Sequence, residues 1–184
     1  MNSHNNGTAK RTLWLLLGAF ILPVVLAYLY LTQGWYQSGA TNKGQLLNNL
    51  SYQSLAVSNP AERQWQVITL LPAHCDSNCQ DRLATLRQTH IALGREQDRV
   101  VPLVYLTDQS DPDIRGELAS QALRAAGAEM PVQQALADVA MVVVDPLGQW
   151  VMAYPAVQGT EAQIQQGRDL LSDLRKLLKL SRIG

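Results

Sequence analysis

The sequence has few of the features that identify common protein classes. Its 15 Lys and Arg residues balance 15 Asp and Glu residues, so the composition gives no sign of a nucleic-acid binder. Internal repeats and low-complexity tracts are absent, which excludes solenoids and disordered scaffolds. There is no phosphate-binding glycine loop, paired-carboxylate site or serine nucleophile elbow. The chain has only two cysteines. Its 184 residues leave room for one membrane anchor and one ordinary domain.

A long apolar run without charge lies near the start of the chain. Residues 13–31 read LWLLLGAFILPVVLAYLYL. About 20 apolar residues are needed to cross a bilayer core of roughly 30 Å, so the run predicts a transmembrane helix over residues 13–32. Pro23 lies in its middle, and spanning helices tolerate proline when the freed backbone groups are satisfied locally.

The charges flanking this run predict its orientation. Lys10 and Arg11 precede it, and the next basic residue is Lys43, so the positive-inside rule places a tail of residues 1–12 in the cytoplasm and the rest of the chain outside. The alternative is a cleaved signal peptide, because residues 38–40 (SGA) resemble a small-residue cleavage site. The run exceeds the roughly 7–15 residues of a signal-peptide core, which favours a retained anchor. Both alternatives export the remainder of the chain.

The exported part divides into a linker and a domain. Residues 33–60 are rich in Gln, Asn, Ser and Gly and are interpreted as a polar linker, and residues 61–184 as the domain. Apolar runs and turn residues predict strands at 65–71, 99–106, 140–144 and 149–154, and helices at 77–93, 112–127, after Pro131 and at 160–180. This order predicts an α/β sandwich with parallel pairing first and antiparallel pairing last, which is typical of a thioredoxin-like domain.

Cys75 and Cys79 lie where the first of these strands leads into a helix. A helix N-terminus stabilises a thiolate and lowers the pKa of a cysteine. Such a pair can cycle between dithiol and disulfide, or hold a soft metal such as Cu(I). The alternative is a structural disulfide, as in many exported domains, although so short a loop adds little stability. Cys75 is interpreted as the attacking thiol because it is expected nearest the exposed turn.

The domain contains other potential ligands, two histidines and three methionines. His74 directly precedes Cys75 and is a candidate third copper ligand or local base, with an exposed loop histidine as the alternative. His90 falls on the apolar face of the following helix and is interpreted as a packing residue. Methionine mostly fills protein cores, so core packing is the interpretation of the three methionines in the domain, Met130, Met141 and Met152.

Three segments resemble the SCO/SenC family, thioredoxin-like copper chaperones of cytochrome c oxidase assembly. They are the 65–71 strand ending in CDSNC, LVYLTD at 103–108 and MVVVDPLGQWVMAY at 141–154. The resemblance implies copper binding by Cys75 and Cys79. It also implies a bacterial inner-membrane protein with its domain in the periplasm, and oxidase subunits or assembly factors as partners.

The chain departs from the family pattern at the third ligand. The family histidine lies several residues before the strand that leads into a D-P-x-G turn, and this sequence has Ala137 and Asp138 there. The family's prolines around the cysteines are also missing. This pattern is more similar to a short, single-anchor bacterial branch, which could supply electrons to reduce a disulfide while another chaperone loads copper.

Three functions therefore compete. The first is oxidase assembly through copper, with Cys75, Cys79 and His74 as ligands. The second is a general thiol–disulfide oxidoreductase, which is the enzyme activity the motif would support. The third is a non-catalytic accessory or assembly subunit. The missing histidine counts against the first, the C-x-x-x-C spacing against the second, and the redox-type position of both cysteines against the third.

Overall fold

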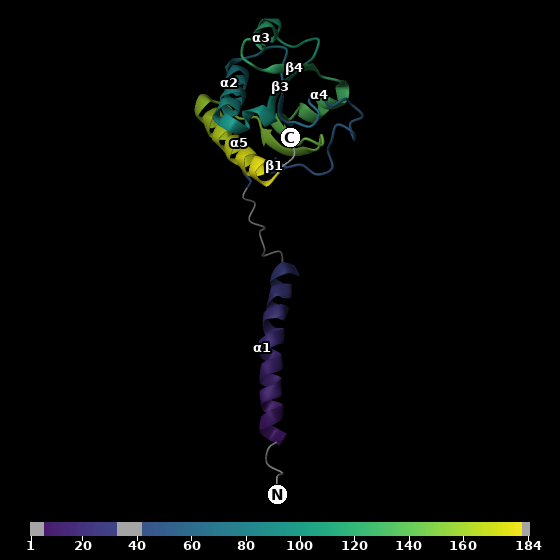
Figure 1. Cartoon of the computed structure of the whole chain (residues 1–184), viewed down its shortest axis with the longest axis vertical. Coiled ribbons are helices and arrows are strands. Elements are labelled where there is room, and N and C mark those ends of the chain that lie inside the picture. The colour runs from purple at the N-terminus through teal and green to yellow at the C-terminus, as the bar shows by residue number, and fades with distance from the viewer. Residues whose placement is uncertain (1–5, 33–41, 182–184) are drawn as a thin grey trace. The chain divides into compact units, whose positions relative to one another are not determined.

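The computed structural model describes residues 6–32 and 42–181, which fall into two compact units, Met1–Thr41 and Asn42–Gly184 (Figure 1). The first unit contains helix α1 (Asn6–Thr32). Its Lys10–Tyr30 part is long and apolar enough to cross a membrane, a property that an N-terminal signal sequence shares. The outer part of the predicted cytoplasmic tail (1–5), the start of the predicted linker and the possible cleavage site (33–41) lie outside the described residues.

The second unit is built on one sheet of six strands in the order β1-β6-β5-β2-β3-β4. Its elements are β1 (Gln45–Leu46), β2 (Trp65–Leu70), α2 (Ser77–Ala92), the 3-10 helix η1 (Gly94–Arg99), β3 (Val100–Leu106), α3 (Pro112–Glu117), β4 (Arg124–Gly127), α4 (Met130–Leu136), β5 (Val139–Val144), β6 (Trp150–Pro155) and α5 (Thr160–Leu180). Strands β2, β3 and β4 are parallel, whereas β5 runs antiparallel to β2 and β6. The predicted thioredoxin-like α/β fold is confirmed.

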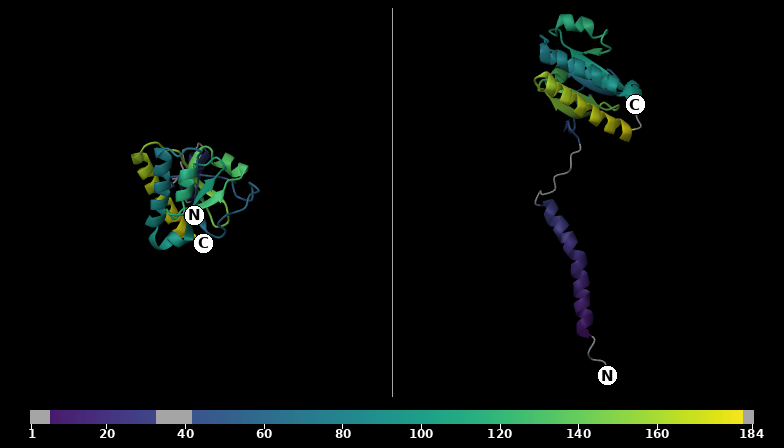
Figure 2. Two further views of the ribbon diagram at one scale, coloured as in Figure 1. Left: turned by 90° about the horizontal axis from the view of Figure 1, so that it is seen from above. Right: turned by 90° about the vertical axis from the view of Figure 1, so that its left-hand side faces the viewer.

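The sheet is covered on both faces, so its central strands are buried throughout. Helices α2 and α5 lie side by side on one face (Figures 1 and 2). Trp65 and Val67 of β2 belong to the core on that face, together with both cysteines. Ile68 belongs to the core on the opposite face, where α4 packs. Such double burial explains why these strands are continuous apolar runs.

Residues 42–60, assigned to the linker by composition, pack on the sheet as part of the second unit. Strand β1 pairs with β6. Tyr52 is buried, and its hydroxyl donates to Gln66 Oε1 (2.8 Å) and accepts a hydrogen bond from Tyr105 Oη (3.0 Å). Gln66 Nε2 in turn donates to Asn59 Oδ1 (2.8 Å). The polar composition of this segment suggested a linker, but its polar side chains form hydrogen bonds with one another and with the sheet.

A buried carboxylate fastens the start of this unit to α5. Asp173 is 1% exposed, and its Oδ2 accepts hydrogen bonds from the backbone N–H groups of Lys43 (2.7 Å) and Gly44 (3.0 Å) and from Tyr154 Oη (3.0 Å). Its Oδ1 lies 3.3 Å from Lys176 Nζ. Burial and the nearby charge of Asp173 raise the pKa of Tyr154. A β-carbon on Gly44 would come within 2.8 Å of Tyr154 Cζ, so the close approach requires glycine.

The predicted helix at 112–127 is wrong over its second half. Helix α3 ends at Glu117, a turn with Ala122 at φ +57° follows, and Arg124–Gly127 forms β4. Strand β4 pairs parallel to β3, with Leu103 opposite Arg124. Since the short RAAG segment has neither alternation nor β-branched residues, only the free edge of β3 determines its conformation.

Candidate functional site

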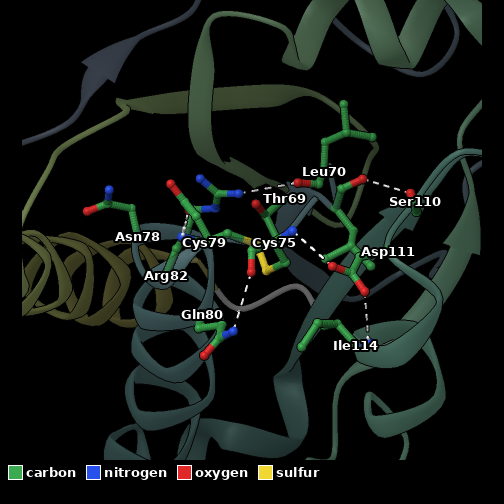
Figure 3. The surroundings of a disulfide bond; sticks show 12 residues. Thr69, Leu70, Cys75, Asn78, Cys79, Gln80, Arg82, Ser110, Asp111 and Ile114 are labelled. Atoms are coloured by element: carbon green, nitrogen blue, oxygen red, sulfur yellow. Dashed lines mark hydrogen bonds between the residues drawn. A yellow bond between two sulfur atoms is a disulfide. The ribbon is translucent and has the colours of Figure 1, made fainter. Parts of the chain in front are cut away.

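Cys75 and Cys79 lie between the end of β2 and the first turn of α2 and form a disulfide bond (Figure 3). Their Cα atoms are 5.1 Å apart. The two residues are 4% and 2% exposed and form part of the core between the sheet, α2 and α5. The disulfide is therefore at the boundary between the hydrophobic core and the loops at the carboxyl end of β2.

Asp76, between the cysteines, caps the helix that carries Cys79. Its backbone is extended (φ −70°), and its side chain accepts a hydrogen bond from the Cys79 N–H at 2.9 Å. This hydrogen bond, helped by the positive charge of Arg82, holds the pKa of Asp76 below its usual value. An aspartate directly before a helix is a common N-cap signal.

Asp111 holds the backbone of Cys75 from a loop far along the chain. Its Oδ2 accepts the Cys75 N–H at 3.0 Å, and its Oδ1 accepts the N–H groups of Asp113 (3.1 Å) and Ile114 (3.4 Å) at the start of α3. The hydrogen bond from Cys75 is the main cause that lowers the pKa of Asp111. Ser110 Oγ also donates to Leu71 O (2.7 Å). Asp111 thus joins the cysteine loop to α3 (Figure 3).

An open groove of about 620 Å³ lies beside the disulfide. Cys79 and Arg82 of α2 line it, with His74 on the cysteine loop and Ala137 and Asp138 at the junction of α4 and β5. The remaining lining residues are Leu70, Pro72, Asp76, Asn78, Leu136, Val139, Ala156, Val157 and Gln158. Ala137 and Asp138, near which the SCO-type histidine was expected, therefore line the same groove as Cys79.

Arg82 is the one arginine or lysine that lines this groove, and its donors are largely unused. The side chain reaches from α2 toward the end of β2, where Nη2 lies 3.5 Å from Leu70 O (Figure 3). Its Nε is buried without a hydrogen-bond partner. Burial lowers the pKa of the guanidinium, and the negative charge of Asp76 opposes this effect. Arg82 was not predicted as a site residue, although its position three residues after Cys79 puts both side chains on one helix face.

Comparison with known proteins agrees with this architecture. Residues 65–181 match the family model described as "Transmembrane-like, thioredoxin-like, C-terminal domain". The chain belongs to this family. No curated protein matches the sequence.

Solved structures resemble this family member at low identity. Apo Sco1 from Thermus thermophilus has a TM-score of 0.53 and 16% identity over 77% of this chain and 99% of its own. Copper-bound yeast Sco1 has a TM-score of 0.49 and 13% identity over 75% and 89%. The thioredoxin domain of a thiol-disulfide oxidoreductase from Bacteroides vulgatus has a TM-score of 0.45 and 17% identity over 73% and 90%. At such identities the likeness is one of fold.

Of the predicted copper ligands Cys75, Cys79 and His74, the two cysteines are joined as a disulfide. No group of three or more His, Cys, Asp or Glu residues suited to a metal ion occurs within residues 6–32 and 42–181. His74 is exposed at the groove, while His90 Nε2 lies 3.0 Å from Gln97 O. Asp138 offers hard oxygen ligands, whereas Cu(I) prefers soft sulfur.

The methionines give no further ligands at the site. Met141 and Met152 are buried in the core, and the sulfur of Met152 lies 3.2 Å from Tyr154 Oη. Met130, which was also expected to pack in the core, is 63% exposed at the start of α4. None of the three lines the groove beside the disulfide.

Proposed function

We propose that this protein carries out thiol–disulfide exchange through Cys75 and Cys79. One observation carries the proposal: a disulfide at a strand–helix junction borders an open groove, which Cys79 lines. A partner chain in this groove would lie next to Cys79, so exchange needs only a local opening of the loop around the buried disulfide. A disulfide with a purely structural role has no need of such a groove.

The exchange is a transfer of two electrons between sulfur pairs. In the reduced protein, one cysteine thiolate attacks a partner disulfide, forms a mixed disulfide and releases one partner thiolate. The second cysteine then attacks the mixed disulfide, closes the Cys75–Cys79 bond and releases the second partner thiolate. The partner is reduced by two electrons and the protein is oxidised by two. The reverse sequence oxidises a partner dithiol.

The side chains around the pair have supporting roles in this cycle. Asp76 and Asp111 hold the backbone amides of Cys79 and Cys75, so both cysteines keep their positions when the disulfide opens. Gln80 Nε2 donates to Cys75 O at 3.3 Å and adds a third tie to this loop. Because the first attack needs access, trapping of the mixed disulfide in single-cysteine variants would decide between Cys75, the prediction from sequence, and Cys79.

We also propose a biological setting for this chemistry. The apolar helix α1 would anchor the protein in a bacterial inner membrane with the domain in the periplasm, where disulfides persist. Its partners would be cytochrome c oxidase subunits or assembly factors whose cysteines must be reduced. The support is the set of motifs shared with the SCO/SenC family, together with the thioredoxin-like fold.

Copper delivery is the second candidate, favoured by His74 lining the same groove as Cys79. Copper would then be cargo, held by two thiolates and one imidazole in the reduced protein. Titration of the reduced chain against a competing Cu(I) chelator tests this candidate. Tight, stoichiometric binding that both Cys75→Ser and His74→Ala weaken would support it, and binding no stronger than that of two unassisted thiols would remove it.

Redox equilibration tests the exchange function directly. The full chain in a non-ionic detergent is incubated with glutathione buffers of graded ratio, quenched with acid, and its free thiols are labelled and counted by mass. We expect a reversible transition between no thiols and two, with the fold retained at both ends. A Cys75→Ser variant is the matched control and should show no such transition. A bond that resists glutathione and dithiothreitol until the domain unfolds would identify a structural disulfide instead.

A further inference from the structure

Arg82 forms unusually few hydrogen bonds for a partly buried cation. Its side chain is partly buried, yet its closest hydrogen-bond acceptor is a single carbonyl oxygen 3.5 Å away. In the described part of the chain, no carboxylate lies within 4.0 Å of its nitrogens, and the described ion pairs are Arg99–Glu96 and Lys176–Asp173. A guanidinium has five N–H donors and normally forms several hydrogen bonds when it is withdrawn from water. The donors that face the groove are therefore available to a ligand.

The acidic residues of the groove do not form an ion pair with Arg82. Asp76 is exposed and already accepts the Cys79 N–H. Asp138, between α4 and β5, also lines the groove and is exposed. Charges that face solvent are screened over about 8 Å at physiological ionic strength, whereas a partly buried charge is screened much less. An anionic group that enters the groove therefore interacts most strongly with Arg82.

Arg82 is also placed to act on whatever reacts with the disulfide. It follows Cys79 by three residues in α2, and both residues line the groove. A carboxylate bound by the guanidinium would be held next to the sulfur pair. Arg pairs with carboxylates through parallel hydrogen bonds, which fix direction as well as distance.

We propose that Arg82 selects the partner, by binding an acidic side chain next to the cysteine that undergoes exchange. This inference rests on the proposed thiol–disulfide exchange and names its substrate class: a segment of a partner polypeptide with Asp or Glu close to its reacting cysteine. Arg82 is a specificity-determining residue, since the bonds formed and broken remain those between sulfur atoms. The electrons pass from the cysteine pair to the partner disulfide as described above.

Three small disulfides that differ in charge test the proposal. The probes are dithiodipropionate (anionic), hydroxyethyl disulfide (neutral) and cystamine (cationic). The full chain in a non-ionic detergent is reduced, desalted and mixed with an excess of each probe, and the loss of protein thiols is followed by acid quench and labelling. We expect the anionic probe to react faster than the cationic one, and added salt to reduce the difference.

The matched variants are Arg82→Gln and Arg87→Gln, two arginines of the same helix, of which only Arg82 lines the groove. Arg82→Gln should lower the ratio of the anionic rate to the neutral rate by about fivefold, as expected for a partly buried charge pair worth about 1 kcal/mol. Arg87 is exposed, and its substitution should leave the ratio at the wild-type value.

The outcomes separate this inference from the proposed function. If the neutral probe oxidises the wild-type protein but Arg82→Gln leaves the ratio unchanged, or slows all three probes equally, the inference fails and the exchange function stands. If the reduced wild-type protein reacts with none of the probes, both fail. A selective loss with the anionic probe, absent in Arg87→Gln, supports the inference.

Discussion

Two regions of the domain use the same interaction, a carboxylate that accepts backbone N–H groups, in different surroundings. Asp173 is almost completely buried and receives hydrogen bonds from the first residues of the domain and from Tyr154. Asp76 is exposed and Asp111 is half-buried, each in a loop, and they hold the two cysteines. Burial makes the first interaction expensive to break, whereas water can replace the lost hydrogen bonds in the second. The first region is therefore held more firmly than the second, which suits the proposed disulfide exchange.

The largest expected effect is at the buried carboxylate. Asp173→Ala leaves the N–H groups of Lys43 and Gly44 and the Tyr154 hydroxyl without their acceptor in a buried site. Hydrogen bonds to a charged group each contribute about 1.5–3 kcal/mol, so we expect the free energy of unfolding to fall by about 3 kcal/mol or more. Urea denaturation of the full chain in detergent measures this change.

Asp169→Ala is the matched control for this prediction. Asp169 lies one turn earlier in α5, and its carboxylate is paired with Gln165 in an exposed hydrogen bond. Its loss should change the free energy of unfolding by less than about 0.5 kcal/mol, as for most surface substitutions. Equal losses in the two variants would contradict the distinction between the buried and the exposed carboxylates.

Opening the disulfide should lower the free energy of unfolding by less than Asp173→Ala does. The bond between Cys75 and Cys79 closes a loop with a sequence separation of 4. Closing so short a loop restricts the unfolded chain little, which gives a stabilisation of about 2 kcal/mol. We expect reduction to lower the free energy of unfolding by this amount and to leave a folded domain. Urea denaturation with and without a phosphine reductant measures it.

A Cys75→Ser/Cys79→Ser double variant is the control, because its unfolding should not respond to the reductant. If reduction lowered the free energy of unfolding by more than Asp173→Ala does, the cysteine region and not the Asp173 region would be the more firmly held. The disulfide would then be the main structural tie of the domain, and the exchange function would lose its physical basis.

Much of the fold could be predicted from the sequence, because strands that are buried on both faces are continuous apolar runs. The predicted strand at 65–71 and helix at 160–180 match β2 and α5 closely. The exceptions are segments whose structure depends on distant partners. Arg124–Gly127 becomes a strand because β3 has a free edge, and the polar residues 42–60 pack on the sheet through hydrogen bonds to Gln66 and Asp173. No local pattern encodes such partners.

The candidate site shows the same division. The cysteine pair and its position at a helix start could be predicted from spacing, and Asp76 from the capping preference of aspartate. Asp111 could be predicted as a helix cap, but its second oxygen binds the Cys75 N–H across 36 residues of sequence. Arg82 could be placed on the face of Cys79, but its unused donors are visible only once the groove around it is known.

The smallest effect concerns the half-buried carboxylate of Asp111 and its dependence on pH. The hydrogen bond from the Cys75 N–H keeps the pKa of Asp111 in the folded protein below its usual value, which is about 3.9 in unfolded chains. A carboxyl with a lowered pKa stabilises the fold fully above the usual value, and this contribution disappears as the pH falls through the folded value. We therefore expect Asp111→Asn to be less stable than the wild type by a constant amount between about pH 5 and pH 7, because ordinary carboxyl groups are largely ionised in that range. The difference should shrink below about pH 4.

Urea denaturation at a series of pH values measures this difference in stability. Asp108→Asn, which replaces an exposed aspartate of the same loop, is the control for the loss of one charge. A difference between wild type and Asp111→Asn that stays constant down to pH 2, far below the usual value, would show that the charge of Asp111 does not contribute to holding the cysteine loop.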